Sequence, residues 1–278
     1  MPQMRDRLLS GATIALTTVM GVVAFLYPFW LPAVATSGNG LAHASDAPLL
    51  LTAIVGLSFL ALLLEAQRAA EHALLVALLG VLVAMNAILR FIDLALPLPG
   101  GFSPIFVLII LTGYLFGGSF GFLMGALTLV VSALITGGVG PWLPYQMLTA
   151  GWVGLSAPLC RGPARALGGP GTRAEVLLLA LFGACWGFGY GAIMNLWFWP
   201  VASGALDQHY QAGISLGETL RRYLAFYLAT SFFWDLAGGI GNALLIGAFG
   251  GPILRALRRF ARRFAFVIRP ATLTEEPS

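Results

Sequence analysis

Few side chains in this sequence could do chemistry, and most of them interrupt apolar runs. Arg90 and Asp93 lie one helical turn apart, Asp235 lies deep in another apolar run, and Asn195 stands among tryptophans. Charges inside a membrane are costly and by default indicate function, while a buried amide needs hydrogen-bond partners. The alternatives are a structural Arg90–Asp93 ion pair at the interface and, for the tryptophans, an interfacial aromatic belt.

A second candidate is the stretch 137–154, GGVGPWLPYQMLTAGWVG, which breaks a long apolar run. Its two prolines cannot donate backbone hydrogen bonds, and non-helical backbone near a bilayer is tolerated only where it is packed in protein or lines a cavity. We therefore predict that Trp142, Tyr145, Gln146 and Trp152 lie at the mouth of a site. A simple interfacial turn is the alternative.

Known catalytic motifs are absent from the sequence. Without any lysine there is no phosphate-binding P-loop, and neither a metalloprotease His/Glu pair nor a Gly-x-Ser-x-Gly elbow occurs. His43 and Asp46 are three residues apart and could share a metal, but two candidate ligands favour a solvated loop instead. We predict no catalytic residue, no metal and no cofactor in this chain.

Composition places these residues in a membrane. Of 278 residues, 59% are hydrophobic and only 9% are charged, against roughly 25% charged in soluble domains. All fifteen basic residues are arginine, so the pI near 9.4 is explained by cytoplasmic loops rather than by nucleic acid binding. We predict a polytopic protein of the cytoplasmic membrane.

The hydropathy pattern predicts an all-α integral membrane protein with eight spans and both termini in the cytoplasm. Only Arg90, Arg221 and Arg222 fall at outer ends, which fits the positive-inside rule. We expect a two-helix extension over residues 1–72, a six-helix core over 73–254 and a basic amphipathic tail over 255–278. The predicted spans are Leu8–Val34, Pro48–Leu64, Ala73–Leu96, Ser103–Phe116, Gly118–Ile135, Leu143–Leu159, Ala174–Trp199 and Arg221–Gly250.

Small residues recur every three or four positions along the third span. One helical face is formed by Ala73, Ala77, Gly80, Ala84 and Ala87. Such faces let another membrane helix approach closely. The sequence leaves packing within the chain and docking of a partner subunit equally open.

From about Ala73 onward, the sequence resembles the substrate-binding S component of energy-coupling factor (ECF) vitamin transporters. The resemblance is carried by VALLGVLVAMNAILR at 76–90 and by SPIFVLIILTGYLFGGSFGFLMGALTLVVSALITGGVGPWLPYQM at 103–147, of which GPWLPYQM is the most specific part. Six helices are typical of S components and match the six spans predicted from Ala73. The first two spans depart from that pattern.

The resemblance implies a transmembrane scaffold and two ATPase subunits as partners, with ATP used by those subunits. It implies that Ala73, Ala77, Gly80 and Ala84 dock the scaffold. It places a vitamin in the outer half, against Trp142, Tyr145 and Gln146, with Asn195, Asp235 and Arg90 as less certain neighbours.

The aromatic, proline-rich rim is similar to that of S components assigned to cobalamin, and a large flat corrinoid would suit a wide apolar site. A small anionic vitamin would need a cationic side chain dedicated to pairing with it, and only Arg90 is well placed for that role. Two alternatives belong to other classes: a stand-alone secondary transporter, which would show inverted repeats, and a membrane enzyme using Asp235 and Arg90.

Overall fold

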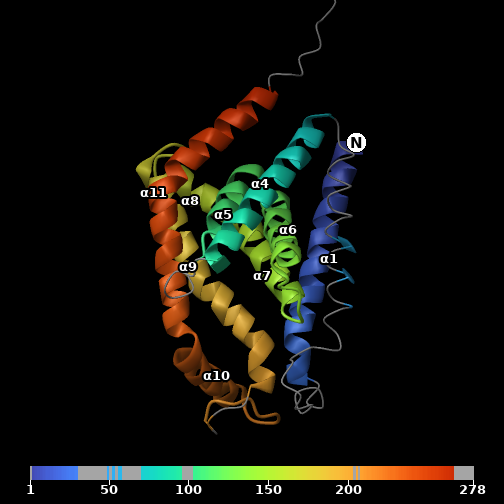
Figure 1. The fold of residues 1–278 in the computed structure, drawn as a ribbon, viewed down its shortest axis with the longest axis vertical. Helices are drawn as coiled ribbons and strands as arrows, with labels where there is room; N and C mark the ends of the chain where they lie inside the picture. Colours follow the sequence, from blue (N-terminus) through green and yellow to red (C-terminus); the bar gives the residue numbers. More distant parts are fainter. Residues whose placement is uncertain are drawn as a thin grey trace, which may run out of the picture.

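The computed structural model describes residues 2–30, 49, 52–53, 56–57, 70–95, 103–202, 205 and 207–265. The elements of this part are helical, joined by turns (Figure 1). The α-helices are α1 (Pro2–Trp30), α4 (Ala70–Ala95), α5 (Ile105–Phe116), α6 (Gly118–Thr136), α7 (Leu143–Ser156), α8 (Arg161–Ala166), α9 (Arg173–Phe198), α10 (Leu216–Thr230) and α11 (Phe232–Ala265). Short 3-10 turns follow α7 and α9, at Ala157–Cys160 and Trp199–Val201.

Among these residues, five helices are long and apolar enough to cross a membrane. They contain the segments Gly11–Phe29, Leu74–Asp93, Gly118–Thr136, Arg173–Phe198 and Phe232–Arg262. α5 is apolar but has only 12 residues. The chain is therefore an all-helical, multi-pass membrane protein. The predicted second span, 48–64, lies almost entirely outside the described residues, as do His43 and Asp46.

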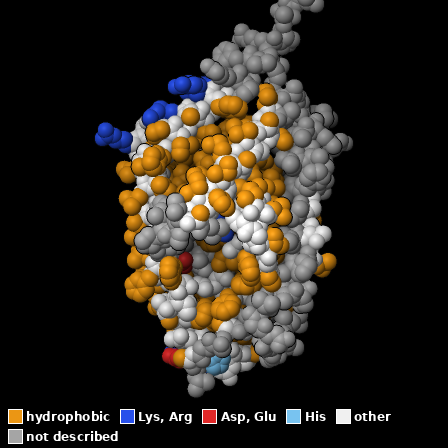
Figure 2. All heavy atoms as spheres, viewed as in Figure 1, with side chains coloured by type: hydrophobic (Ala, Val, Ile, Leu, Met, Phe, Trp, Pro, Cys, Tyr) orange, Lys and Arg blue, Asp and Glu red, His pale blue; other side chains and the backbone are white. Residues whose placement is uncertain are grey.

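The bundle has two chemically different ends. α9 begins and α11 ends at the same end, near the start of α1, and basic side chains gather there in the space-filling view (Figures 1 and 2). We call this the arginine-rich end; its described members are Arg161, Arg165, Arg173, Arg255, Arg258, Arg259 and Arg262. The opposite end carries α10, and we call it the α10 end.

Glycines allow two helix pairs to touch backbone to backbone. A Cβ placed on Gly121 of α6 would overlap the backbone of Gly154 on α7. A Cβ on Gly187 of α9 would likewise meet the backbone of Gly239 on α11. Such close approach without side chains is how membrane helices gain packing energy, because lipid supplies no hydrophobic drive between them.

Two helix ends follow the predicted boundaries. α5 ends and α6 begins at Gly117, whose φ is 115°, and α6 ends at Gly137, which is left-handed with φ 69°. Both conformations favour glycine because it has no Cβ.

The last predicted span, Arg221–Gly250, was wrong as a single helix. The structure has two helices, α10 and α11, which meet at Ser231, where φ is −128°. The break leaves Asp235 in the first turn of α11 rather than deep within one long span. α11 then continues through residue 255, where the sequence predicted the tail to start.

α1 is attached to the rest of the bundle by specific contacts. Trp152 Nε1 on α7 donates to Thr18 Oγ1 on α1 at 3.3 Å. At the α10 end, the Tyr210 hydroxyl donates to the backbone oxygen of Phe29 at 3.1 Å. This part of the N-terminal extension therefore packs against the predicted core.

Candidate functional site

A polar stripe crosses the junction of α10 and α11. Tyr223, Tyr227, Ser231 and Asp235 are four residues apart, so they share one side of the continuing chain. The Tyr223 hydroxyl donates to the backbone oxygen of Ala192 on α9. The stripe therefore faces α9.

Asn195 on α9 and Asp235 on α11, both predicted from the sequence, are brought together by this stripe. Ser231 Oγ donates to Asn195 Oδ1 at 3.1 Å. Ser231 also accepts a backbone hydrogen bond from Asp235 N at 2.9 Å. Ser231 therefore links the two predicted site residues directly.

Asn195 Nδ2, Tyr227 Oη and Asp235 Oδ2 are buried and make no hydrogen bond of good geometry within the described part of the chain, although the Tyr227 hydroxyl and the Asp235 carboxyl lie close enough to interact with each other. Buried polar groups in proteins are nearly always bonded, and each exception needs an explanation. They offer an amide donor, a hydroxyl and a carboxyl oxygen between α9, α10 and α11. We call Asn195, Tyr227, Ser231 and Asp235 the kink cluster.

Tyr145 lies inside the bundle, fully buried, rather than at an open mouth. Phe25 of α1 meets its ring edge to face, with ring centroids 4.8 Å apart. The Trp197 ring of α9 lies on another side, at 6.2 Å. Tyr145 is thus part of an aromatic contact that joins α1, α7 and α9.

Trp142 and Gln146 lie nearer the surface at the start of α7. Trp142 is 36% exposed, and its ring covers the position that a Cβ would occupy at Gly140. Gln146 is half-buried, and no described residue forms a hydrogen bond with its side chain. Its amide is available to a ligand.

Arg90 does not pair with Asp93 in the described structure, although the two lie one turn apart on α4. Its guanidinium is half-buried and lies within electrostatic reach of the Tyr190 hydroxyl on α9. The Tyr190 ring packs edge-on against Phe106 of α5, with centroids 4.9 Å apart. Arg90 is therefore close to α9, but no described contact joins it to the kink cluster.

Figure 2 shows a hollow at mid-height of the visible face, with basic and acidic atoms in view.

Sequence reasoning missed Tyr227 and Ser231. The signal was present, because a polar residue every fourth position in an apolar segment predicts one polar helical face. Trp199, for which the sequence suggested an interfacial aromatic belt, is 1% exposed and packs against Phe29 and Tyr210.

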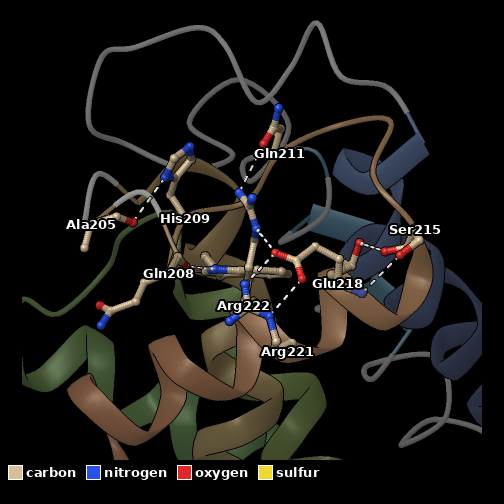
Figure 3. A network of polar contacts seen from close by, with 10 residues as sticks. Ala205, Gln208, His209, Gln211, Ser215, Glu218, Arg221 and Arg222 are labelled. Atoms are coloured by element: carbon tan, nitrogen blue, oxygen red, sulfur yellow. Dashed lines mark hydrogen bonds and ion pairs between the residues drawn. The ribbon is translucent and has the colours of Figure 1, made fainter.

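A network of charged and polar side chains lies at the α10 end, around the start of α10 (Figure 3). Glu218 accepts hydrogen bonds from Arg221 and from Arg222 at 2.7–2.8 Å, and Arg222 reaches Gln211 at 3.1 Å. Ser215 caps the start of α10 by accepting from Glu218 N. Because Glu218 sits between two guanidinium groups, hydrogen bonds from Arg221 and Arg222 lower the pKa of its carboxyl to about 2.

The small-residue face of α4 points away from the described helices. Ala77, Gly80 and Ala84 are exposed, and no atom lies within 4 Å of the position that a Cβ would take at Gly80. Ala87, which was predicted to share this face, is instead fully buried on the other side, so the prediction was wrong for this residue. There Asn86 Nδ2 donates to the backbone oxygen of Ile105 at 3.0 Å and to Thr128 Oγ1 at 3.2 Å. The side chain of Ala73 lies outside the described part.

No group of three or more metal-binding side chains occurs among the described residues. The residues singled out are instead suited to binding by hydrogen bonds and aromatic contact, on an apolar helical scaffold.

A family model of the ECF transporter substrate-specific component matches residues 75–248, from the first turns of α4 into α11. The chain belongs to this family. It is a substrate-specific transporter subunit, and the family is not one of enzymes. Membership implies a substrate and association with scaffold and ATPase subunits. The match leaves α1 outside it. A search of curated proteins and a search of solved structures each gave no significant match.

Proposed function

We propose that this S component captures a vitamin from the outer side of the cytoplasmic membrane, with cobalamin as the preferred substrate. It then delivers the vitamin by association with a transmembrane scaffold and two ATPase subunits, which use ATP. The observation that carries the proposal is the kink cluster, in which the buried Asn195 Nδ2 has no partner within the described part and lies beside the interacting Tyr227 hydroxyl and Asp235 carboxyl.

Cobalamin suits these groups by its chemistry. Its corrin ring is broad and apolar, and its periphery carries amides that both donate and accept hydrogen bonds. Ligand sites combine apolar and aromatic walls with a few placed polar groups. The half-buried Trp197, which packs beside Tyr145, supplies aromatic surface, and the kink cluster with Gln146 supplies polar contacts.

One observation favours a second substrate class. Arg90 has no carboxylate partner in the described structure. A half-buried guanidinium within a span is costly unless an anion pairs with it. An anionic vitamin whose carboxylate pairs with Arg90 is therefore the alternative to cobalamin.

The exposed face of Ala77, Gly80 and Ala84 supports docking of the scaffold at α4. None of the described helices covers this face, and small side chains permit close approach of a second helix. Docking on α4 would leave substrate binding undisturbed, because the kink cluster lies between other helices, α9, α10 and α11.

Mass spectrometry of ligand bound to the purified chain tests the substrate. We expect a corrinoid, with Gln146→Ala and Tyr227→Phe each weakening binding by about tenfold, since a lost hydrogen bond in a buried site costs about 1–2 kcal/mol. The variant Arg90→Gln separates the two classes: it leaves corrinoid affinity unchanged, whereas it abolishes binding of an anionic vitamin. Unchanged substrate affinity in both Gln146→Ala and Tyr227→Phe would refute this placement of the site.

Co-expression with a scaffold and ATPases tests the transport role. We expect a complex that survives purification and ATP-dependent uptake in vesicles. Uptake by the chain alone, driven by an ion gradient, would instead support a secondary transporter.

A further inference from the structure

A pocket of about 350 Å³ lies at the arginine-rich end, between the first turns of α9 and the second half of α11. It is at the opposite end of α9 from Asn195, so it is distinct from the proposed vitamin site. Three arginines and one glutamate line it: Arg173, Glu175, Arg255 and Arg258.

The acidic member of this pocket is already fully bonded. Glu175 accepts from Arg258, from the Tyr114 hydroxyl at 2.7 Å and from Gly171 N at 2.8 Å. Its side chain is 1% exposed. Glu175 and Arg258 therefore neutralise each other within the wall of the pocket.

The other two arginines carry the remaining charge. Arg173 and Arg255 are exposed, and neither has an acidic partner among the described residues. Thr172 caps the start of α9 by accepting from Glu175 N, and this helix end still adds the positive end of its dipole. The pocket is thus built to receive an anion that the described part of the chain does not supply.

The wall below these arginines is apolar and open. It continues along Val176 and Leu177 of α9 and Gly247 of α11. Leu177 is 66% exposed, and no atom lies within 4 Å of a Cβ position at Gly247. A ligand that fits both parts carries a negative charge at one end and a hydrocarbon chain at the other.

We propose that this pocket binds the phosphate headgroup of an anionic membrane lipid, with an acyl chain lying along the Leu177–Gly247 wall. Basic pockets between membrane helices are suited to such headgroups. A soluble phosphate compound would match the arginines but would leave the apolar wall unused, so the lipid is the occupant that the geometry favours. The inference does not depend on the identity of the vitamin.

Native mass spectrometry of the full chain tests the charge requirement, with phosphatidylglycerol titrated against phosphatidylcholine. We expect retention of phosphatidylglycerol only, and about fivefold weaker binding for Arg173→Gln and for Arg255→Gln, as one arginine near a lipid surface contributes that much. Arg262→Gln is the matched control, because it removes an exposed arginine of the same helix that does not line the pocket. Equal losses in all three variants would show diffuse surface attraction and overturn the proposal.

The apolar wall is tested separately with Gly247→Trp, which fills open space without changing charge. We expect it to weaken phosphatidylglycerol binding as strongly as Arg255→Gln, while thermal stability stays at the level of the unaltered chain. Inorganic phosphate should fail to displace the lipid. Displacement by phosphate, or unchanged lipid binding in Gly247→Trp, would refute a lipid site.

Discussion

The carboxylate of Asp235 on α11 lies against Gly191 on α9, in the space that a side chain at residue 191 would occupy. Glycine at this position therefore lets the acid approach the α9 backbone. The same pair sets the spacing of α9 and α11 at the level of the kink cluster.

Gly191→Ala is expected to destabilise the protein by at most about 1 kcal/mol, because the added methyl displaces the end of the Asp235 side chain while alanine gains helix propensity. Thermal unfolding in detergent micelles measures the loss. The variant should also weaken vitamin binding, since the Asp235 side chain must move. Gly217→Ala, at a helical position where no atom lies within 4 Å, is the control and should leave stability unchanged or slightly raised.

A double variant shows whether the overlap is the cause. If Asp235→Ala is combined with Gly191→Ala, the space is free again, and the two changes should cost less together than the sum of their separate costs. Additive costs would mean that Gly191 is needed for another reason.

Two alanines three residues apart on α4 should respond in opposite ways to added bulk. Ala84→Trp on the exposed face should abolish complex formation and uptake while leaving vitamin binding by the isolated chain intact. Ala87→Trp should instead unfold or strongly destabilise the chain, because Ala87 is fully buried. Co-purification, binding and melting assays on both variants separate the effects. Loss of vitamin binding in Ala84→Trp would show that this face packs inside the protein.

Removing the buried carboxylate at the arginine-rich end should be costly. Glu175→Ala leaves Arg258, whose side chain is 18% exposed, without its partner, so we expect a loss of about 3 kcal/mol. Arg258→Met in the same chain should recover part of that loss, because the unpaired charge is gone. Chemical denaturation reports both values, and Arg259→Met, at an exposed position, is the control. A double variant no more stable than Glu175→Ala would contradict the ion-pair account.

The hydrogen bonds from Arg221 and Arg222 to Glu218 should persist in mild acid. The pKa of Glu218 is lowered from 4.5 to about 2 by Arg221 and Arg222, so its stabilising effect is complete above the unfolded value and is lost as the pH falls through about 2. The protection factor at the start of α10, which is the exchange rate corrected for the intrinsic effect of pH, should be unchanged between about pH 7 and 5 and fall only well below that range. Glu218→Gln should show the lower protection factor already at neutral pH. Loss of protection between about pH 6 and 4 would contradict the lowered pKa.

Sequence patterns were sufficient where the cause is local. Gly117 and Gly137 end helices because of their own backbone freedom. The scarcity of polar groups in apolar runs drew attention to Asn195 and Asp235, whose role in a site stays a prediction. The family resemblance carried by residues 76–90 and 103–147 was confirmed by the match to 75–248. These features can be read from a few neighbouring residues.

The remaining features depend on contacts between distant segments. Neither proline nor glycine marks the break at Ser231, whose side chain instead bonds Asn195 on another helix. Trp199 is buried by Phe29, far away in the sequence, and Tyr145 by Phe25. The residues that bury these side chains lie far away in the sequence, so no local pattern reveals the burial.

The glycine contacts between α6 and α7 and between α9 and α11 also restrict how the molecule can move. Backbone touches backbone at Gly121–Gly154 and at Gly187–Gly239, so sliding either pair by one turn would drive side chains into the contact. Interiors packed this closely transmit force rather than deform. We expect each of these two helix pairs to move as a rigid unit, so any conformational change of the chain must occur between the pairs rather than within them.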